Sequence, residues 1–331
     1  MKVAVLGAGA WGTALAIHLA KKYHVTLWAR NRSHISGMKK ARSNPKYLGN
    51  FLFPENLSLE NDLHAAVGPS DLIISAVPTS AFRKLLFELN VINKLPIIWA
   101  NKGLEVGTGM LPHEVAIDVL GDPSLSSRDF GVISGPSFAA ELVRGLPTAV
   151  TLAATSEELC QFAANAFHHG CMRIYTSNDV AGVSVGGALK NVIAIAAGIS
   201  DGMGFGNNAR AAIITRGLTE ISRFGESIGA NADTFSGLAG TGDLVLTCTG
   251  EYSRNREVGL RLAQGRTINE ILDGLGHVAE GVFTAKEVIN RGALLGIEMP
   301  ITFQVSQVIH GGKAPRDAVQ DLLSREIKAE H

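Results

Sequence analysis

The chain has 331 residues, of which 46% are hydrophobic and 18% charged, and its 30 basic and 30 acidic residues cancel to no formal net charge. A balanced charge gives no global field that would recruit nucleic acid or an anionic membrane, so an anionic ligand must be bound by local cations. The length suits two domains. The three cysteines have no CxxC spacing and no export signal precedes the first predicted strand, which together favour reduced thiols and a cytoplasmic protein.

The first residues predict a strand, a glycine turn and a helix. An apolar strand pattern at residues 3–6 runs into GAGAWG, and an apolar helical run follows at residues 13–20. In this context Gly7 permits the tight turn, Gly9 lets the backbone approach a pyrophosphate, and Gly12 lets the helix pack close to the strand. The positive end of the helix dipole would face the phosphates. The segment therefore predicts dinucleotide binding, with a βα turn without a ligand as the plainer alternative.

The second predicted strand, residues 24–29, ends where a dinucleotide fold normally carries the acidic residue that binds the ribose hydroxyls. This chain has Arg30 there, Arg32 close behind, and no Asp or Glu between Trp28 and Ile35. A guanidinium binds a 2′-phosphate bidentately, whereas a carboxylate would repel it. The sequence therefore favours NADP over NAD, unless Arg30 only begins a solvated helix.

Further along the chain, short apolar strand patterns alternate with helical patterns. Strands are expected at residues 71–77, 97–100, 130–134, 148–153 and 172–176. This alternation predicts an α/β domain with a doubly wound, mostly parallel sheet of the Rossmann type, whose ligands bind at the carboxyl ends of the strands. Helical patterns such as 209–228 and 268–272 take over beyond residue 180. We therefore expect a dinucleotide-binding domain over residues 1–180 and an all-α-helical substrate or catalytic domain over residues 181–331.

Residues 180–199 form a nearly continuous apolar run whose centre carries Lys190 and Asn191. A charge at the centre of a membrane span is costly, so a buried helix of a globular domain fits this run better. Lysine is almost never fully buried without a partner, and we therefore expect Lys190 to be functional. In a closed site its ammonium can give a proton to the alkoxide that forms on a reduced carbonyl, and take it back in the reverse reaction.

Two further candidates follow predicted strands. Lys102 comes after the strand at residues 97–100, where it would bind an anionic substrate or be simply solvated. The segment Gly135-Pro136-Ser137 is interpreted as a helix start with proline in the first turn, whose backbone would cap the helix or cradle a ligand.

Two more candidates lie in the helical part. A second glycine-rich segment, GLAGTGD, ends in Asp243, which is predicted either to cap a helix or to orient the lysine and a substrate hydroxyl. The segment YSRNR contains Ser253, Arg254 and Asn255, a hydroxyl, a guanidinium and an amide, which are the donors that a phosphate binds. A solvated charged turn is the alternative for that segment.

With these motifs in place, the chain resembles the bacterial soluble NAD(P)-dependent glycerol-3-phosphate dehydrogenases over essentially its whole length. The resemblance rests on GAGAWGTALA, ANKG, SGPSFAAE, GGALKN, GLAGTGDL, SRN and VAEG, in this order. It implies a dinucleotide domain followed by a helical substrate domain, a homodimer, and the interconversion of dihydroxyacetone phosphate and sn-glycerol 3-phosphate, a precursor of glycerophospholipids.

The resemblance also implies the residues of the site. Beside Gly7, Gly9 and Gly12, the cofactor would contact Trp11, Arg30, Lys102, Ala139, Arg254, Val278 and Glu280. The substrate would contact Lys102, Gly135, Ser137, Lys190, Asp243, Ser253, Arg254 and Asn255. Lys190 would be the proton donor or acceptor. Arg30 varies in kind among members, so NADP is the preferred cofactor and NAD stays open.

Two other functions stay open at this point. A related hydroxyacid or 6-phosphogluconate type of dehydrogenase shares the architecture and a helix lysine, and a catalytically silent NADP-sensing module is the alternative from another class. The presence of Lys190, Asp243 and Arg254 together argues against the sensing module. No metal is expected, because His168 and His169 are adjacent and no HExxH or Cys/His ligand spacing occurs.

Overall fold

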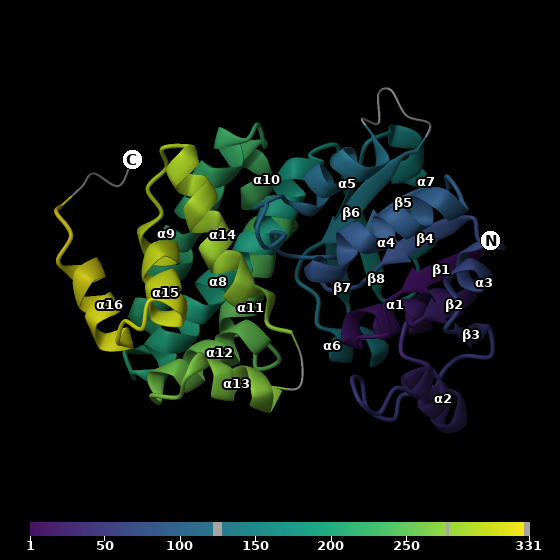
Figure 1. Cartoon of the computed structure of the whole chain (residues 1–331), viewed down its shortest axis with the longest axis horizontal. Helices are drawn as coiled ribbons and strands as arrows, with labels where there is room; N and C mark the ends of the chain where they lie inside the picture. The colour runs from purple at the N-terminus through teal and green to yellow at the C-terminus, as the bar shows by residue number, and fades with distance from the viewer. Residues whose placement is uncertain (122–127, 276–277, 328–331) are drawn as a thin grey trace. The chain divides into compact units, whose positions relative to one another are not determined.

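The computed structural model describes residues 1–121, 128–275 and 278–327. The chain forms two compact units, which Figure 1 shows with the chain coloured by residue number. Unit 1 consists of Met1–Lys102 and Met110–Ser184, and unit 2 consists of Gly103–Gly109 and Val185–His331. The sequence placed a single boundary after residue 180 and gave no sign that Gly103–Gly109 groups with the helices.

Unit 1 is built on one eight-stranded sheet with the strand order β3-β2-β1-β4-β5-β6-β7-β8. Its strands are β1 (Lys2–Leu6), β2 (His24–Trp28), β3 (Leu57–Glu60), β4 (Leu72–Ser75), β5 (Ile97–Trp99), β6 (Phe130–Ser134), β7 (Thr148–Ala154) and β8 (Met172–Ser177). Neighbouring strands are parallel except β6 and β7, which are antiparallel. The predicted doubly wound, mostly parallel sheet is thus confirmed.

The central strands are short aliphatic runs because helices cover both faces of the sheet. The sequences LIIS in β4 and IIW in β5 are buried at every position, as is typical of parallel strands. The edge strand β3 was missed by the sequence interpretation. Its LSLE sequence is only half buried and offers two apolar residues, too few to stand out from the preceding loop.

The helices of unit 1 are α1 (Ala10–Ala20), α2 (Arg32–Ala41), α3 (Leu63–Val67), α4 (Thr79–Ile92), α5 (Pro112–Leu120), α6 (Ala139–Val143) and α7 (Glu157–Phe167). Helix α1 packs against α6 and α7, and α4 packs against α5. All residues of α1 from Gly12 to Ala20 are buried, and they join β1, β2, β7 and β8 in one hydrophobic core. The helix that follows the glycine turn is therefore fixed rigidly in unit 1.

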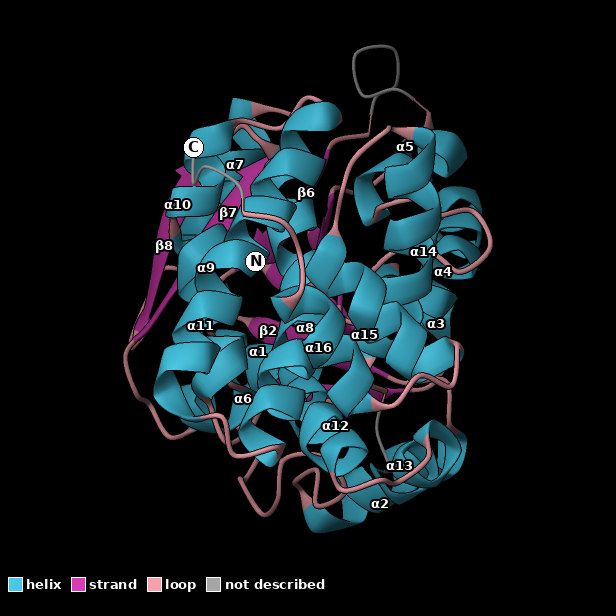
Figure 2. Ribbon diagram, turned by 90° about the vertical axis from the view of Figure 1, so that its left-hand side faces the viewer, coloured by secondary structure: helices cyan, strands magenta, loops and turns pink. Residues whose placement is uncertain are grey.

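Every regular element of unit 2 within the described residues is a helix (Figure 2). It contains α8 (Val180–Gly202, which begins in unit 1), α9 (Gly206–Ser227), α10 (Ala232–Ser236), the π-helical turn η1 (Leu238–Gly242), α11 (Asp243–Thr249), α12 (Arg254–Ala263), α13 (Ile268–Leu275), α14 (Glu280–Leu294), α15 (Pro300–His310) and α16 (Pro315–Leu323). One hydrophobic core joins α8 with α12, α13, α14, α15 and α16.

Helix α8 is the apolar run that the sequence assigned to a buried helix. By length and composition it could cross a bilayer, but 89% of its most apolar 18-residue window is buried inside the protein. Its small residues bring other segments close. A Cβ on Gly259 of α12 would lie 2.8 Å from Cα of Gly198, so these two helices touch backbone to backbone.

Candidate active site

The glycine turn joins β1 to α1 as the sequence predicted. Gly7 has a φ of +114°, a conformation that favours glycine, and a Cβ there would lie 2.7 Å from the carbonyl carbon of Ala76. A Cβ on Gly12 would collide with the carbonyl oxygen of Gly7. In contrast, within the described residues no atom lies within 4 Å of a Cβ built on Gly9. The turn therefore leaves open space beside Gly9.

This open space suits a dinucleotide. Gly9 is the N-cap of α1 and has no side chain to bind the first N–H groups of the helix, which have no acceptor within the helix itself. These N–H groups and the helix dipole favour a negatively charged ligand such as a pyrophosphate. Trp11, in the first turn of α1, is partly buried against the core of unit 1. The residues present therefore fit the cofactor that the sequence predicted.

Arg30 is exposed and lies between β2 and α2. Asn31 caps α2 by accepting a hydrogen bond from the backbone N–H of His34, at 2.9 Å. The neighbouring strand β3 ends at Glu60, which pairs in register with Trp28. The carboxylate of Glu60 accepts hydrogen bonds from the backbone N–H groups of residues 61 and 62, and these bonds lower its pKa. The carboxylate of Glu60 is thus engaged by its own backbone, and Arg30 is an exposed cation just beyond the end of β2.

A buried polar pair lies at the carboxyl ends of β4 and β5. The hydroxyl of Ser75 donates to Oδ1 of Asn101 over 3.2 Å, and both side chains are buried. Nδ2 of Asn101 is also buried and has no hydrogen-bond partner in the part of the chain that the structure describes. Such an orphaned donor is expected where a ligand supplies the missing acceptor. Lys102, the next residue, is partly buried.

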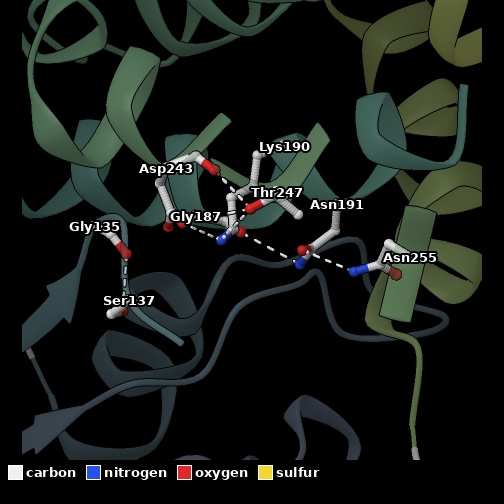
Figure 3. A network of polar contacts seen from close by, with 8 residues as sticks. All are labelled: Gly135, Ser137, Gly187, Lys190, Asn191, Asp243, Thr247 and Asn255. Carbon is white, nitrogen blue, oxygen red and sulfur yellow. Dashed lines mark hydrogen bonds and ion pairs between the residues drawn. The ribbon is translucent and has the colours of Figure 1, made fainter. Parts of the chain in front are cut away.

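The segment after β6 is not a helix start, and that expectation was wrong. Helix α6 begins only at Ala139, so Pro136 lies outside it. Gly135 has a φ of +142°, and the hydroxyl of Ser137 donates to the Gly135 carbonyl over 2.9 Å, closing a separate turn (Figure 3). A Cβ on Gly135 would lie 2.9 Å from Cα of Val150, so the turn also depends on close packing against β7.

Lys190 lies inside unit 2 with only 6% of the residue exposed. Its ammonium donates to Oδ1 of Asp243 and, over 2.9 Å, to the hydroxyl of Thr247 (Figure 3). Asp243 is only 1% exposed and begins α11 without capping it, and its carboxylate accepts from Lys190 instead. Its contact with a substrate hydroxyl stays a prediction. The Thr247 hydroxyl in turn donates to the backbone carbonyl of Asp243 over 2.6 Å.

The close approach of α8 to the π-helical turn η1, which leads directly into α11, depends on glycine. A Cβ on Gly186, four residues before Lys190, would collide with the carbonyl oxygen of Ala239 in the π-helical turn η1. This close approach brings the start of α11 to the lysine.

Cys248 follows Thr247 and is fully buried, and burial raises the pKa of its thiol to about 12. The thiol is therefore neutral and takes no part as a nucleophile.

The side chain of Asn255 connects Asn191, the residue after Lys190, with Gly281. Its Nδ2 donates to Oδ1 of Asn191 over 2.9 Å, and its Oδ1 accepts from the backbone N–H of Gly281 over 3.1 Å. Asn191 itself donates to the carbonyl of Gly187, and both asparagines are buried (Figure 3). The polar atoms of Asn255 are thus used to connect α8, α12 and the start of α14, and its contact with a substrate stays a prediction.

Arg254 lies at the N-terminus of α12. Ser253, which is buried, caps this helix by accepting from the N–H of Arg256 over 3.3 Å. Arg254 is exposed, and its guanidinium donates to the carbonyl of Val278 over 3.4 Å. Glu280 begins α14. The structure therefore brings together three of the residues assigned to the cofactor, and it adds the positive end of a helix dipole to the charge of Arg254.

The sequence interpretation did not assign Thr247 or Asn191 to the site. Thr247 follows Asp243 by four residues, so both lie on one face of α11, which is the only signal that could have indicated it. Among residues 1–121, 128–275 and 278–327, no group of three His, Cys, Asp or Glu side chains is placed to bind a metal ion. Cys160, Cys171 and Cys248 are free thiols.

Two family profiles match the chain, one over its N-terminal part and one over its C-terminal part. The profile of the NAD-dependent glycerol-3-phosphate dehydrogenase N-terminus matches residues 2–160, and the profile of the C-terminus of the same enzymes matches residues 179–320. The chain belongs to the glycerol-3-phosphate dehydrogenase family. It is thus an NAD(P)-dependent oxidoreductase, as the resemblance predicted.

Relatives within this dehydrogenase family align over the full chain. The glycerol-3-phosphate dehydrogenase [NAD(P)+] of Methylobacillus flagellatus is 60% identical over 331 residues, covering 100% of this chain and 99% of the relative. The enzyme of the same name from Aromatoleum aromaticum is 51% identical over 332 residues, with both chains covered completely. The crystal structure of glycerol-3-phosphate dehydrogenase from Coxiella burnetii is 42% identical, with a TM-score of 0.93 over 98% of this chain and 99% of that one.

More distant structures share the fold alone. D-mandelate dehydrogenase in complex with NADH is 14% identical, with a TM-score of 0.61 over 94% of this chain and 98% of that one. A probable 2-dehydropantoate 2-reductase of Bacillus subtilis is also 14% identical, with a TM-score of 0.57 over 95% of this chain and all of that one. The architecture by itself therefore does not distinguish this dehydrogenase family from the hydroxyacid type.

Proposed function

We propose that the chain catalyses the reversible NAD(P)H-dependent reduction of dihydroxyacetone phosphate to sn-glycerol 3-phosphate, with NADPH preferred. The observation that carries this proposal is the buried ammonium of Lys190, hydrogen-bonded to Asp243 and Thr247. Family membership and the relatives' printed names support the reaction. Unit 1 would bind the dinucleotide at the glycine turn, and unit 2 would supply the proton.

In this proposal each residue has a chemical role. Bound nicotinamide would supply the hydride that reduces the carbonyl carbon. Lys190 gives a proton from Nζ to the carbonyl oxygen as that carbon is reduced, and takes it back during oxidation of the alcohol. Asp243 and Thr247 hold Nζ in one place, which reduces the entropy lost in reaching the transition state.

The phosphate of the substrate would be bound at the N-terminus of α12. Arg254 supplies a guanidinium there, and the helix dipole adds further positive potential. Ser253 accepts a hydrogen bond as the helix cap, so the cap uses a lone pair of its hydroxyl and leaves the hydrogen to donate. Lys102, Gly135 and Ser137 are proposed as further contacts, together with a cytoplasmic location and a homodimer.

The decisive experiment measures the loss of NADPH absorbance when dihydroxyacetone phosphate is added to the purified protein. Parallel assays with carboxylate-bearing ketoacids, and with 6-phosphogluconate and NADP for oxidation, test the hydroxyacid alternative. Turnover with dihydroxyacetone phosphate alone supports the proposal, and turnover only with the carboxylate substrates contradicts it. NADPH binding without turnover on any of these substrates would instead indicate a sensing module.

A further inference from the structure

Asn44 is a buried polar residue of unit 1 that none of the proposed roles above uses. It lies in the loop after α2 and is only 1% exposed. Its side chain makes three hydrogen bonds: Nδ2 donates to the carbonyl of Ala8 over 3.0 Å and to the hydroxyl of Thr13 over 2.8 Å, and Oδ1 contacts Nε2 of His34 at 3.0 Å. A buried amide with all its hydrogen-bonding groups engaged fixes the segments that it joins.

These contacts determine the orientation of the amide. The carbonyl of Ala8 can only accept a hydrogen bond, so the atom facing it must be the Nδ2 donor. Oδ1 therefore faces His34, and the Nε2 atom of that imidazole must carry a hydrogen. Both hydrogens of Nδ2 are used within the protein, so Asn44 has no donor left for a ligand. Its role is indirect.

The partners of Asn44 belong to the two ends of the predicted cofactor site. Ala8 lies between Gly7 and Gly9 in the glycine turn, and Thr13 lies in the first turns of α1. His34 lies in the first turn of α2, and its backbone N–H donates to the cap residue Asn31, next to Arg30. One side chain thus connects the turn predicted to bind the pyrophosphate with the segment predicted to bind the 2′-phosphate.

The loop that carries Asn44 is itself anchored. The Asn44 carbonyl accepts from the N–H groups of Tyr47 and Leu48 over 3.2 and 2.9 Å, and a β-bridge pairs Asn44 with Gly49. The Tyr47 ring packs edge-on against the His34 ring, with 5.3 Å between centroids. The loop therefore holds Asn44 in place from both backbone and side-chain contacts, which is what a positioning residue requires.

We propose that Asn44 is a positioning residue for the dinucleotide, which holds the glycine turn and the start of α2 in register and so determines cofactor affinity. The inference rests on the proposed function in that the ligand is NADPH. It assigns to Asn44 no contact with the cofactor or the reacting atoms. Loss of this amide should weaken cofactor binding and leave the chemical step unchanged.

The test measures the dissociation constant of NADPH by fluorescence titration without substrate, together with kcat, the KM for dihydroxyacetone phosphate and the melting temperature. In Asn44→Asp, an oxygen replaces Nδ2 opposite the Ala8 carbonyl, and we expect the NADPH dissociation constant to rise roughly tenfold while kcat at saturating cofactor changes less than about twofold. His34→Phe keeps an aromatic ring beside Tyr47 but removes the hydrogen-bond donor to Asn44. Because His34 lies at the start of α2, in the segment predicted to bind the 2′-phosphate, this variant should weaken the binding of NADPH more than that of NADH.

The matched control is Asn56→Ala. Asn56 donates to the carbonyl of Ala20 at the other end of α1, and its loss should leave the NADPH dissociation constant unchanged. If Asn44→Asp does not fold, His34→Phe and Thr13→Val decide the matter. Folded variants that bind NADPH as the wild type does, with only a lowered melting temperature, overturn the inference. Because titration needs no turnover, an inactive wild type would contradict the proposed function separately.

Discussion

The side-chain amide of Asn255 lies 2.9 Å from the side-chain oxygen of Asn191 and donates a hydrogen bond to it. Asn191 follows Lys190 directly, and Asn255 follows Arg254 directly. Together with the N–H of Gly281, this contact joins the GGALKN, SRN and VAEG motifs at one buried amide. The proposed proton donor and the proposed phosphate-binding arginine are therefore fixed relative to one another within unit 2.

Replacing Lys190 tests the proton donor. Lys190→Met keeps a flexible chain of similar length without the ammonium, and we expect kcat to fall at least about 10²-fold because general acid catalysis is lost. The NADPH dissociation constant should stay close to that of the wild type. Lys84→Met, which removes an exposed lysine of α4, serves as the control. Wild-type turnover in purified Lys190→Met would remove Lys190 from the mechanism.

Coupling between Lys190 and Asp243 tests the buried ion pair. Asp243→Asn leaves the ammonium without a charged partner, and we expect it to cost roughly 3–5 kcal/mol in the free energy of unfolding. The double variant Lys190→Met, Asp243→Asn should lose less than the sum of the two single variants, because the uncompensated charge is gone. Urea denaturation of all four proteins measures this, and strictly additive losses would show that the pair is not coupled.

Arg254→Ala tests the phosphate site. We expect the KM for dihydroxyacetone phosphate to rise roughly 10–100-fold, because a charge-assisted hydrogen bond to the phosphate is lost. Competitive inhibition by inorganic phosphate should weaken in parallel. Arg325→Ala, which removes an exposed arginine paired with Glu298, is the control. An unchanged KM together with unchanged phosphate inhibition would argue against this site.

Arg30→Glu tests the cofactor preference. A carboxylate at this position would repel a 2′-phosphate, so the ratio of kcat/KM with NADPH to kcat/KM with NADH should fall at least about tenfold. Steady-state assays with each cofactor give the ratio directly. Arg30→Gln should produce a smaller change in the same direction. A ratio equal to that of the wild type in both variants would show that another group recognises the phosphate.

His18 predicts a pH dependence of stability in unit 1. Burial is the main cause that lowers the pKa of His18 from 6.5 to about 4, and its ring stacks on that of His169 with 4.0 Å between centroids. Below pH 6.5 the imidazole of His18 is protonated in the unfolded chain but stays neutral in the native state. The contribution of His18 to the free energy of unfolding is therefore fully present above pH 6.5, and it falls by roughly 3 kcal/mol as the pH drops from 6.5 toward 4.

Urea denaturation between pH 4 and 7.5, in steps of about half a unit, measures this slope. In His18→Phe the imidazole is absent, so the free energy of unfolding should change less steeply with pH between 6.5 and 4 than it does in the wild type. Above pH 6.5 the two proteins should show the same pH dependence. An identical slope in both proteins would assign the acid sensitivity to other groups.

The sequence was most informative where local pattern and burial coincide. The strands of the sheet were predicted within a few residues because their apolar runs are bounded by turns, and the burial of Lys190 followed from the apolar helix around it. The edge strand β3 has no such run. The turn at Gly135 was misread because its course depends on a positive φ and on packing against Val150, neither of which proline spacing reveals.

The partners within the site were less predictable. Asp243 was a candidate because glycines precede it, but Thr247 reaches Lys190 only through the tertiary approach of α11 to α8. The contact of Asn255 with Asn191 joins residues 64 positions apart. Such contacts depend on helix packing and not on local propensity, so no pattern in one segment indicates them.

The backbone contact of Gly198 with Gly259 bears on how this chain can vary. Asn255 and Gly259 are four residues apart on the same face of α12, so a methyl group at Gly259 would push that face away from α8. The displacement would stretch the Asn255 to Asn191 hydrogen bond without altering any polar side chain. Substitutions near Lys190 are therefore limited by Gly198 and Gly259, where a hydrogen atom stands in place of a side chain and takes no part in the chemistry.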